Sequence, residues 1–139
     1  MTVISKAIHI STKGNCDMID ITTEIAGEIS NSTINNGIAT IFIAGSTAGI
    51  TTMEYETGLV SDFKDMWERN VPLNLPYQHD RRWGDGNGYS HVRASLQGPS
   101  LVVPFANKKM TLGTWQQIVV VDFDNRPRDR EIILQLLGE

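Results

Sequence analysis

The last third of the chain alternates apolar, β-branched stretches with short turn sequences, and this pattern limits the fold more than any other feature. It predicts strands over residues 100–105, 109–112, 114–123 and 130–137. Asn107-Lys108 and Asp124-Asn125-Arg126-Pro127 separate neighbouring strands with residue types that are common in tight turns. Strands joined by such short connections pair antiparallel. The pattern therefore predicts a mainly antiparallel sheet.

Apolar residues recur at helical spacing in two segments of the first half. They predict a helix over residues 17–30 and a second helix over residues 58–70, which Pro72 ends. Ser90 is a candidate cap for a further short turn of helix through Leu96, with Gly98 as its C-terminal stop. Two helices of ordinary length therefore accompany the strands.

Two further strands are predicted in the first half, over residues 3–12 and 38–43. The chain has 139 residues and contains no repeat, low-complexity tract or linker. We therefore expect one domain, residues 1–139, of the α+β class: a mainly antiparallel β-sheet sandwich with two principal helices.

Composition excludes several classes of protein. The formal net charge of −4 argues against a non-specific nucleic-acid binder, which would normally be basic. No apolar run is long enough to cross a bilayer, and the N-terminus does not resemble a signal peptide. Cys16 is the only cysteine, so an intrachain disulfide is impossible, which fits a reducing compartment. We expect a cytoplasmic protein with no nucleic-acid or membrane partner.

The chemically densest segment is residues 77–91, which holds two of the three histidines. Its glycines predict an irregular loop rather than a helix or strand, and such loaded loops often carry binding or catalysis. His79, Asp85 and His91 could converge on a divalent metal, although their spacing matches no standard zinc pattern. Alternatively the aspartates and Asn87 form turns, and the histidines hydrogen-bond the loop to itself. Both interpretations stay open.

A turn of small residues follows the strand at 38–43, with the sequence Ala44-Gly45-Ser46-Thr47-Ala48-Gly49. Small side chains allow backbone N–H groups to approach a phosphate, and the two hydroxyls add donors. The alternative is a simple bend between two strands. Beyond it, Glu54 and Glu56 are candidates for acid–base or metal chemistry, and equally for solvated carboxylates that favour a helix N-terminus.

Arginines and aromatic residues in the last third are further candidates. Arg126, Arg128 and Arg130 alternate around a turn, which suits bidentate contact with phosphate oxygens. Asp124 and Asp129 could instead neutralise them as surface ion pairs. Polar residues around Trp115 at a predicted strand start favour the wall of a ligand site or a subunit contact, or else a partly buried indole.

Several distinctive blocks, read in order, resemble the YjbQ-like family, whose members have been assigned as secondary thiamine-phosphate synthases. The blocks are Tyr77-Gln78-His79-Asp80, Asp85-Gly86-Asn87-Gly88-Tyr89-Ser90-His91, Ala94-Ser95-Leu96-Gln97-Gly98 and Leu112-Gly113-Thr114-Trp115-Gln116. Many members carry a histidine immediately before the Ser/Thr-rich turn, where this chain has Gly45. The resemblance implies an α+β fold, a homotrimer and a pocket near the subunit contacts.

The resemblance also implies an enzyme that joins hydroxymethylpyrimidine diphosphate to thiazole phosphate and releases pyrophosphate. We expect His79, His91, Glu54 and Asp85 to be the catalytic residues. The expected metal ligands are His79, Asp85 and His91, with Mg²⁺ or another divalent metal as the ion. Substrate binding is expected from Ser46, Thr47, Asn87, Trp115, Gln116, Arg128 and Arg130. Trp83 is a second candidate for stacking on a ring.

Two other functions remain open at this stage. One is a non-catalytic trimer that binds a phosphorylated metabolite or a metal, which the loss of a histidine at Gly45 favours. The other is a metal-dependent phosphoester hydrolase that uses the same carboxylates and histidines.

Overall fold

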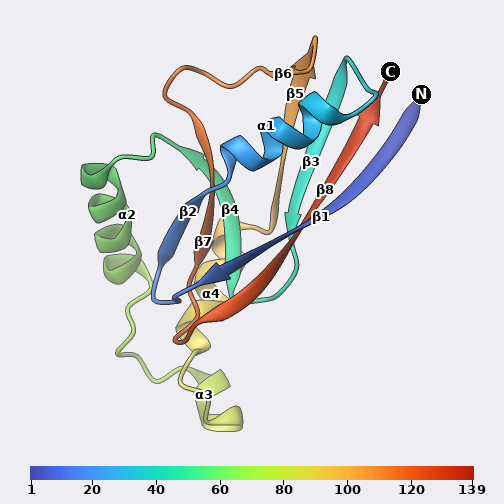
Figure 1. Cartoon of the computed structure of the whole chain (residues 1–139). Coiled ribbons are helices and arrows are strands. Elements are labelled where there is room, and N and C mark those ends of the chain that lie inside the picture. Colours follow the sequence, from blue (N-terminus) through green and yellow to red (C-terminus); the bar gives the residue numbers. More distant parts are fainter.

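The computed structural model describes residues 1–139, which form eight strands and four helices (Figure 1). In chain order the elements are β1 (Thr2–Thr12), β2 (Asp17–Asp20), α1 (Thr22–Asn31), β3 (Gly37–Ile43), β4 (Ala48–Met53), α2 (Thr57–Asn70), α3 (Gln78–Trp83), α4 (Gly88–Gln97), β5 (Ser100–Ala106), β6 (Lys109–Met110), β7 (Gln117–Asp122) and β8 (Arg128–Gly138). No helix is long and apolar enough to cross a membrane.

The strands form two antiparallel sheets. The larger has the order β1-β8-β3-β5-β6, and the smaller has the order β2-β7-β4. Strands β1 and β8 pair along their whole length, from Thr2 opposite Gly138 to Thr12 opposite Arg128. In the larger sheet β1 and β3 each pair with β8 and not with each other. The α+β, mainly antiparallel fold expected from the sequence is confirmed.

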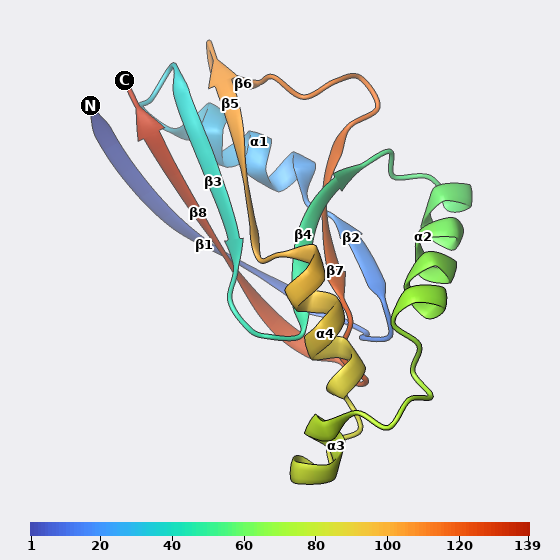
Figure 2. The same ribbon diagram turned by 180° about the vertical axis from the view of Figure 1, so that it is seen from behind.

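Two apolar cores lie on the two faces of the smaller sheet. Ile118 and Val120 of β7 belong to the larger core, which they share with α1 and the inner face of the larger sheet. Val119 and Val121 point the other way, into a second core with residues of α2 and α4. Figure 2 shows α2 and α4 on this side of the smaller sheet. Strand β7 is therefore buried on both faces, which fixes the position of its carboxyl end.

The predicted helix over residues 17–30 begins too early. Asp17–Asp20 is strand β2, which pairs with β7, and the helix starts only at Thr22. The Asp20 carboxylate accepts hydrogen bonds from the backbone N–H and the hydroxyl of Thr22. Met18 in the strand and Ile21 just before the helix are both buried. Together with the apolar residues of α1 they have the spacing of one longer helix, although they belong to two elements.

The predicted loop over residues 77–91 is also wrong. The segment contains α3 and the start of α4. Gly84 takes a left-handed conformation (φ 71°) and ends α3, which is the ordinary place for a glycine beside a helix. Helix α4 begins at Gly88, two residues before Ser90, and ends before Gly98 as expected. The glycines mark helix ends rather than an irregular segment.

Candidate functional site

A polar cavity of about 420 Å³ opens where the β3–β4 turn, α3, α4 and the start of β8 meet. Its lining contains a single hydrophobic residue and gathers most of the chemically reactive side chains that the sequence analysis selected. The lining residues are Gly45, Ser46, Thr47, His79, Trp83, Asp85, Asn87, His91, Arg128 and Arg130. Residues more than 80 positions apart therefore meet at one place.

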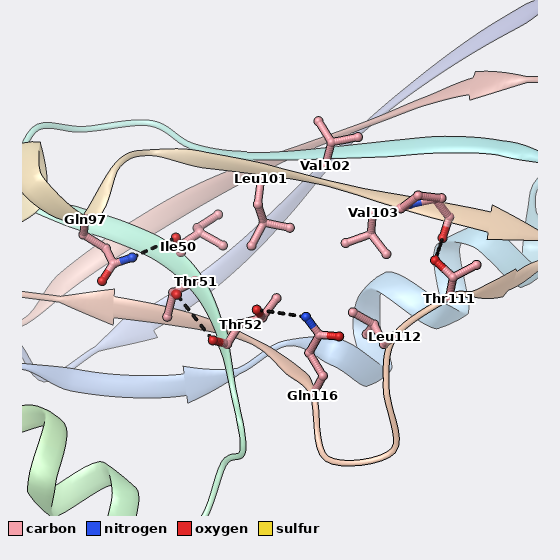
Figure 3. Close-up of a pocket in the computed structure, with 11 residues that line it drawn as sticks. Ile50, Thr51, Thr52, Gln97, Leu101, Val102, Val103, Thr111, Leu112 and Gln116 are labelled. Carbon is pink, nitrogen blue, oxygen red and sulfur yellow. Dashed lines mark hydrogen bonds between the residues drawn. The ribbon is translucent and has the colours of Figure 1, made fainter.

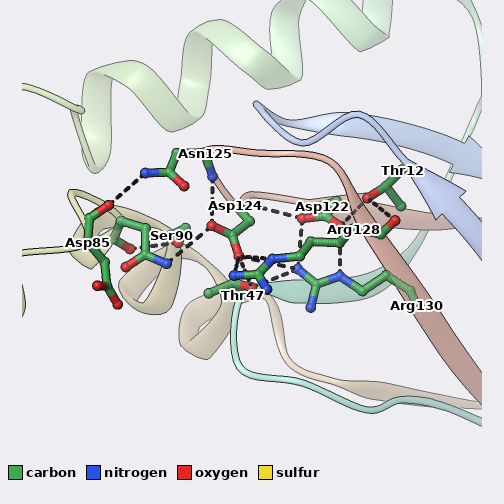
Figure 4. A network of polar contacts seen from close by, with 10 residues as sticks. Thr12, Thr47, Asp85, Ser90, Asp122, Asp124, Asn125, Arg128 and Arg130 are labelled. Carbon is green, nitrogen blue, oxygen red and sulfur yellow. Dashed lines mark hydrogen bonds and ion pairs between the residues drawn. The ribbon is translucent and has the colours of Figure 1, made fainter. Parts of the chain in front are cut away.

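Arg130 is held against the cavity by a buried carboxylate at the end of β7 (Figure 4). Its Nε and Nη2 atoms donate to the two carboxylate oxygens of Asp122 at 2.7 and 2.9 Å. The hydroxyl of Thr12 donates to the same carboxylate at 2.5 Å. A bidentate pair of this kind is short, strong and rigid. Asp122 therefore fixes both the position and the orientation of the Arg130 guanidinium.

Asp124 is the second buried carboxylate, and it connects the elements around the cavity. It accepts hydrogen bonds from the Thr47 hydroxyl (3.0 Å), the Asn87 amide (3.2 Å), the Asn125 N–H (2.8 Å) and Arg128 Nε (2.8 Å). Burial by itself would raise the pKa of Asp124, but these hydrogen bonds together lower it. The carboxylate therefore stays ionised and ties the β3–β4 turn, α4 and β8 together.

Thr47 joins the two carboxylate–arginine pairs. Its hydroxyl donates to Asp124 and accepts a hydrogen bond of 2.6 Å from Nη2 of Arg130. A hydroxyl has one proton to give and can accept at the same time, so both contacts are satisfied. The small turn residues predicted for phosphate contact are thus part of the network that lines the cavity.

Gly45 leaves room for the Arg130 side chain. A Cβ atom at position 45 would lie 2.8 Å from Nη1 of Arg130, closer than van der Waals contact allows. Gly45 also has φ +117°, a conformation that residues with a side chain rarely adopt. Arg130 thus takes the space into which a side chain at position 45 would extend.

His79 and His91 lie against each other at the cavity. Their ring centroids are 4.3 Å apart, and the rings are tilted by 36°. Burial, followed by the charge of the neighbouring His79, lowers the pKa of His91. Nδ1 of His79 is buried without a hydrogen-bond partner and lies 3.8 Å from a carboxylate oxygen of Asp80. Because its pKa is lowered, the His91 imidazole is uncharged at neutral pH and can form hydrogen bonds in the cavity.

The side chains do not gather into a metal site. No group of three histidine, cysteine, aspartate or glutamate residues lies close enough together to hold a metal ion. His79, Asp85 and His91 line one cavity, but they are not arranged as a ligand set. The donors present in one chain thus do not fit the metal centre that their sequence suggested.

Three of the expected site residues lie elsewhere. Glu54 follows β4, whereas Thr47 directly precedes it, so a strand of six residues, about 20 Å long, separates the two. Trp115 lies before β7, at the end opposite Asp122, and 72% of it is exposed. Gln116 donates from its amide to the Thr52 hydroxyl. Antiparallel strands carry these residues away from the cavity.

Gln116 lines a separate cavity of about 370 Å³ between β4 and β5 (Figure 3). Leu101, Val103 and Leu112 form part of its apolar lining.

Of the two glutamates, Glu56 caps α2, because its carboxylate accepts hydrogen bonds from the N–H groups of Gly58 and Leu59. The helix-terminus interpretation of Glu56 is therefore correct.

The sequence analysis did not select Asp122 or Thr12, although both build the cavity. A signal was present in the sequence Val119-Val120-Val121-Asp122, because a carboxylate that directly follows a fully apolar strand is costly to bury without a partner.

Cys16 takes no part in this chemistry, because burial raises the pKa of its thiol to about 11 and keeps it protonated.

The fold and the cavity define a class: an α+β protein with two antiparallel sheets and a polar cavity at the ends of β7 and β8. A sequence model of the family described as UPF0047 protein YjbQ-like matches residues 6–139, and the chain belongs to this family. A UPF0047 protein of Methanothermobacter thermautotrophicus is 38% identical over 139 residues, which cover 100% of this chain and 95% of that relative. The UPF0047 protein YugU of Bacillus subtilis is 35% identical and covers 96% of this chain and 98% of its own length.

Solved structures show the same fold. A crystal structure of a protein of unknown function from Sulfolobus solfataricus P2 superimposes with a TM-score of 0.94 at 33% identity, covering 99% of both chains. A YjbQ/UPF0047 family protein from Clostridium acetobutylicum gives a TM-score of 0.82 at 31% identity, over 94% of this chain and 99% of that chain. The family and the fold are thus established, whereas none of these relatives brings an activity.

Proposed function

We propose that this protein binds the phosphate groups of a small metabolite in the cavity of Arg128 and Arg130. The observation that carries the proposal is the convergence of two guanidinium groups, the Ser46 hydroxyl and two imidazoles on one cavity of about 420 Å³. Guanidinium groups match phosphate oxygens in geometry, and hydroxyl and imidazole N–H groups add further donors. Few other ligands use so many donors at once.

The arginines remain available for a ligand although each is paired with an aspartate. Arg130 uses Nε and Nη2 in its contacts with Asp122 and Thr47, which leaves Nη1 directed toward Gly45 at the cavity. Arg128 contacts a single oxygen of Asp124 through both Nε and Nη2, which leaves its Nη1 free of these contacts. Held arginines lose little freedom on binding, so their remaining donors are preorganised for an anion.

The reaction that we propose is thiamine-phosphate synthesis, which the family resemblance implies. The bond between the pyrimidine methylene carbon and the diphosphate oxygen breaks, and both electrons leave with pyrophosphate. The lone pair of the thiazole nitrogen forms the new carbon–nitrogen bond. Arg128, Arg130 and the hydroxyl of Ser46 would stabilise the charge on the leaving pyrophosphate.

Two other side chains of the cavity have roles in this proposal. A neutral imidazole of His91 can accept or donate a hydrogen bond at the reacting groups. Trp83 lines the same cavity and offers an exposed aromatic face for the ring of the second substrate, the thiazole phosphate. No step is assigned to a divalent ion, because the side chains of one chain do not form a metal site.

The test incubates the purified protein with hydroxymethylpyrimidine diphosphate and thiazole phosphate and measures thiamine phosphate and pyrophosphate. We expect both products, and we expect Arg128→Gln to lower the rate while Arg69→Gln, in the last turn of α2, leaves it unchanged. Parallel reactions with Mg²⁺ and with EDTA show whether a divalent ion is needed. Absence of product at high protein concentration would remove the synthase proposal.

The same preparation separates the other two functions. Binding of the precursors without any product would favour a non-catalytic phosphometabolite-binding protein, for which the ligand raises the thermal stability but is not consumed. Release of phosphate from generic phosphoesters, abolished by EDTA, would favour a metal-dependent hydrolase.

We also propose that the protein assembles as a homotrimer through the outer face of the larger sheet. Three successive rows across β1, β8, β3 and β5 carry no charged side chain on this face: Val3, Leu137, Ile38 and Pro104, then Ser5, Gln135, Thr40 and Val102, then Ala7, Ile133, Phe42 and Ser100. Several of the apolar members are exposed, including Val3 (58%) and Val102 (55%). Apolar patches of this extent mark interaction surfaces.

Sedimentation velocity tests this assembly. We expect a single trimeric species for the natural protein and a smaller species for Phe42→Glu, because a charge buried within an interface is costly. A monomeric natural protein at micromolar concentration would contradict the proposal.

A further inference from the structure

Two smaller cavities share lining residues with the central one, and we refer to the three together as the groove along α4. One, of about 310 Å³, shares Asn87 and Arg128 with the central cavity. The other, of about 290 Å³, shares Ser46 and His91 with it. The groove follows positions 87, 91 and 95 of one helix face, which at 1.5 Å per residue spans about 12 Å. The site is therefore longer than a single phosphate group requires.

One end of the groove is entirely polar and carries an unpaired positive charge. Asn125 and Arg126 line it together with residues of the central cavity, and no hydrophobic side chain is present. Arg128 and Arg130 are neutralised by Asp124 and Asp122, whereas Arg126 makes no ion pair. The three arginines of this turn thus differ, because Arg126 alone keeps a charge without a partner.

Asp85 carries the opposing charge at this end. It lines both the central cavity and the polar cavity, and its backbone carbonyl accepts a hydrogen bond of 2.9 Å from the Asn125 amide. Figure 4 shows its carboxylate pointing away from Asn125 and from the Asp124–Arg128 pair. Asp85 and Arg126 line the same cavity without forming an ion pair, so the Arg126 guanidinium has no carboxylate partner there.

The opposite end of the groove is smaller and less polar. Ala48, Ala94 and Pro99 contribute to its lining, and Ser95 is present with its hydroxyl already donated to the carbonyl of His91. This end holds no side chain with a permanent charge. The unpaired guanidinium of Arg126 therefore lies at one end of the groove, and the least polar lining lies at the other.

We propose that the groove binds an organic diphosphate in one direction. The phosphate next to the organic group lies between Arg128 and Arg130, the terminal phosphate lies at Arg126, and the organic group points toward Ala94 and Pro99. This assignment rests on the phosphate site proposed above and adds to it a second anion subsite and an orientation. Arg126 becomes the residue that distinguishes a diphosphate from a monophosphate.

Calorimetric titration with inorganic phosphate and with pyrophosphate tests the subsite. We expect the natural protein to bind pyrophosphate more tightly than phosphate. Arg126→Gln should weaken pyrophosphate binding by about tenfold, as a charge-assisted hydrogen bond is lost, and should change phosphate binding by less than about twofold. Arg69→Gln is the matched control, because it removes one arginine charge at a residue that lines none of the three cavities.

The outcomes separate this inference from the proposed function. If the natural protein binds neither anion, the phosphate site itself is wrong. Suppose instead that the natural protein binds both anions. If Arg126→Gln then weakens the binding of both anions equally, or weakens the binding of neither anion, the central phosphate site remains supported and the second subsite is wrong.

A second variant tests the orientation. Ser95 is exposed, so Ser95→Leu should fold normally and fill the less polar end of the groove. We expect it to weaken binding of hydroxymethylpyrimidine diphosphate by at least about tenfold, through loss of the space for the ring, and to leave pyrophosphate binding unchanged. Equal binding of the ester by both proteins would overturn the orientation.

Discussion

Two aspartate–arginine pairs lie side by side at the ends of β7 and β8, and they differ in how far water reaches them. In the inner pair only 8% of the Arg130 side chain is exposed, and Asp122 is fully buried. In the outer pair Asp124 is equally buried, but 32% of the Arg128 side chain is exposed. The same chemical groups therefore differ in accessibility: the inner pair joins the ends of the two strands in a buried place, and the outer pair leaves its arginine partly open to water.

The largest effect is expected when the inner pair is broken. Asp122→Ala leaves the Arg130 charge buried without its carboxylate, and we expect a loss of about 3–5 kcal/mol in the free energy of unfolding. Urea denaturation measures this loss. Asp129→Ala, which removes an exposed carboxylate whose only hydrogen-bond contact is the Ser11 hydroxyl, is the control and should change stability by less than about 0.5 kcal/mol. Equal losses in the two variants would contradict the distinction between the pairs.

The outer pair should affect binding more than folding. Arg128→Gln leaves Asp124 with its contacts to Thr47, Asn87 and Asn125, so we expect a loss of only about 1–2 kcal/mol in stability. Phosphate affinity should fall by about tenfold or more, because the variant removes a charged donor that faces the cavity. Calorimetry and urea denaturation on one preparation check both parts, and a stability loss as large as that of Asp122→Ala would refute the comparison.

Gly45 offers a smaller perturbation of the inner pair. Gly45→Ala places a Cβ 2.8 Å from Nη1 of Arg130 at φ +117°, and we expect about 1–2 kcal/mol of destabilisation. The matched control is Gly27→Ala in α1, where no atom lies within 4 Å of the added Cβ. That change should stabilise by about 0.5–1 kcal/mol, because alanine is the better helix residue. Thermal unfolding of the two variants should therefore shift in opposite directions.

The smallest effect concerns pH. The pKa of His91 in the folded protein is lowered from its ordinary 6.5, so the unfolded chain binds a proton more readily. The stability contributed by neutral His91 is complete above that unfolded value and falls as the pH drops from 6.5 toward the folded pKa. His91→Gln should remove this part of the acid sensitivity, giving a flatter stability profile just below pH 6.5. An unchanged slope would show that His91 does not titrate differently in the two states.

The sequence predicts the strands well because alternation of apolar and polar residues survives in β3, β5 and β8. It misplaces the start of α1, because a buried Met18 in a strand and a buried Ile21 at the helix start have helical spacing by chance. It misreads residues 77–91 because glycines at helix ends look the same in sequence as glycines in a loop. Local patterns therefore predict element type but not where one element gives way to the next.

The candidate site follows a similar rule. Ser46, Thr47, His79, His91, Arg128 and Arg130 were selected from their chemistry, and the structure brings them to one cavity. Trp115 and Gln116 were selected as well, but the direction of β7 takes them to its other end. The sequence signals that Asp122 needs a partner, because it directly follows an apolar strand, but it does not identify Thr12 and Arg130 as its partners, because these contacts join different strands.

The pairing of β1 with β8 has a consequence for how fast the native structure forms. The two strands join residues as far apart as Thr2 and Gly138, which are separated by 136 positions, and β8 alone connects β1 to β3. Proteins dominated by such distant contacts fold over about milliseconds to seconds, since a long stretch of chain must close before any contact compensates for the lost entropy. Arg128 and Arg130 belong to β8, so the pocket can assemble only after this slow closure.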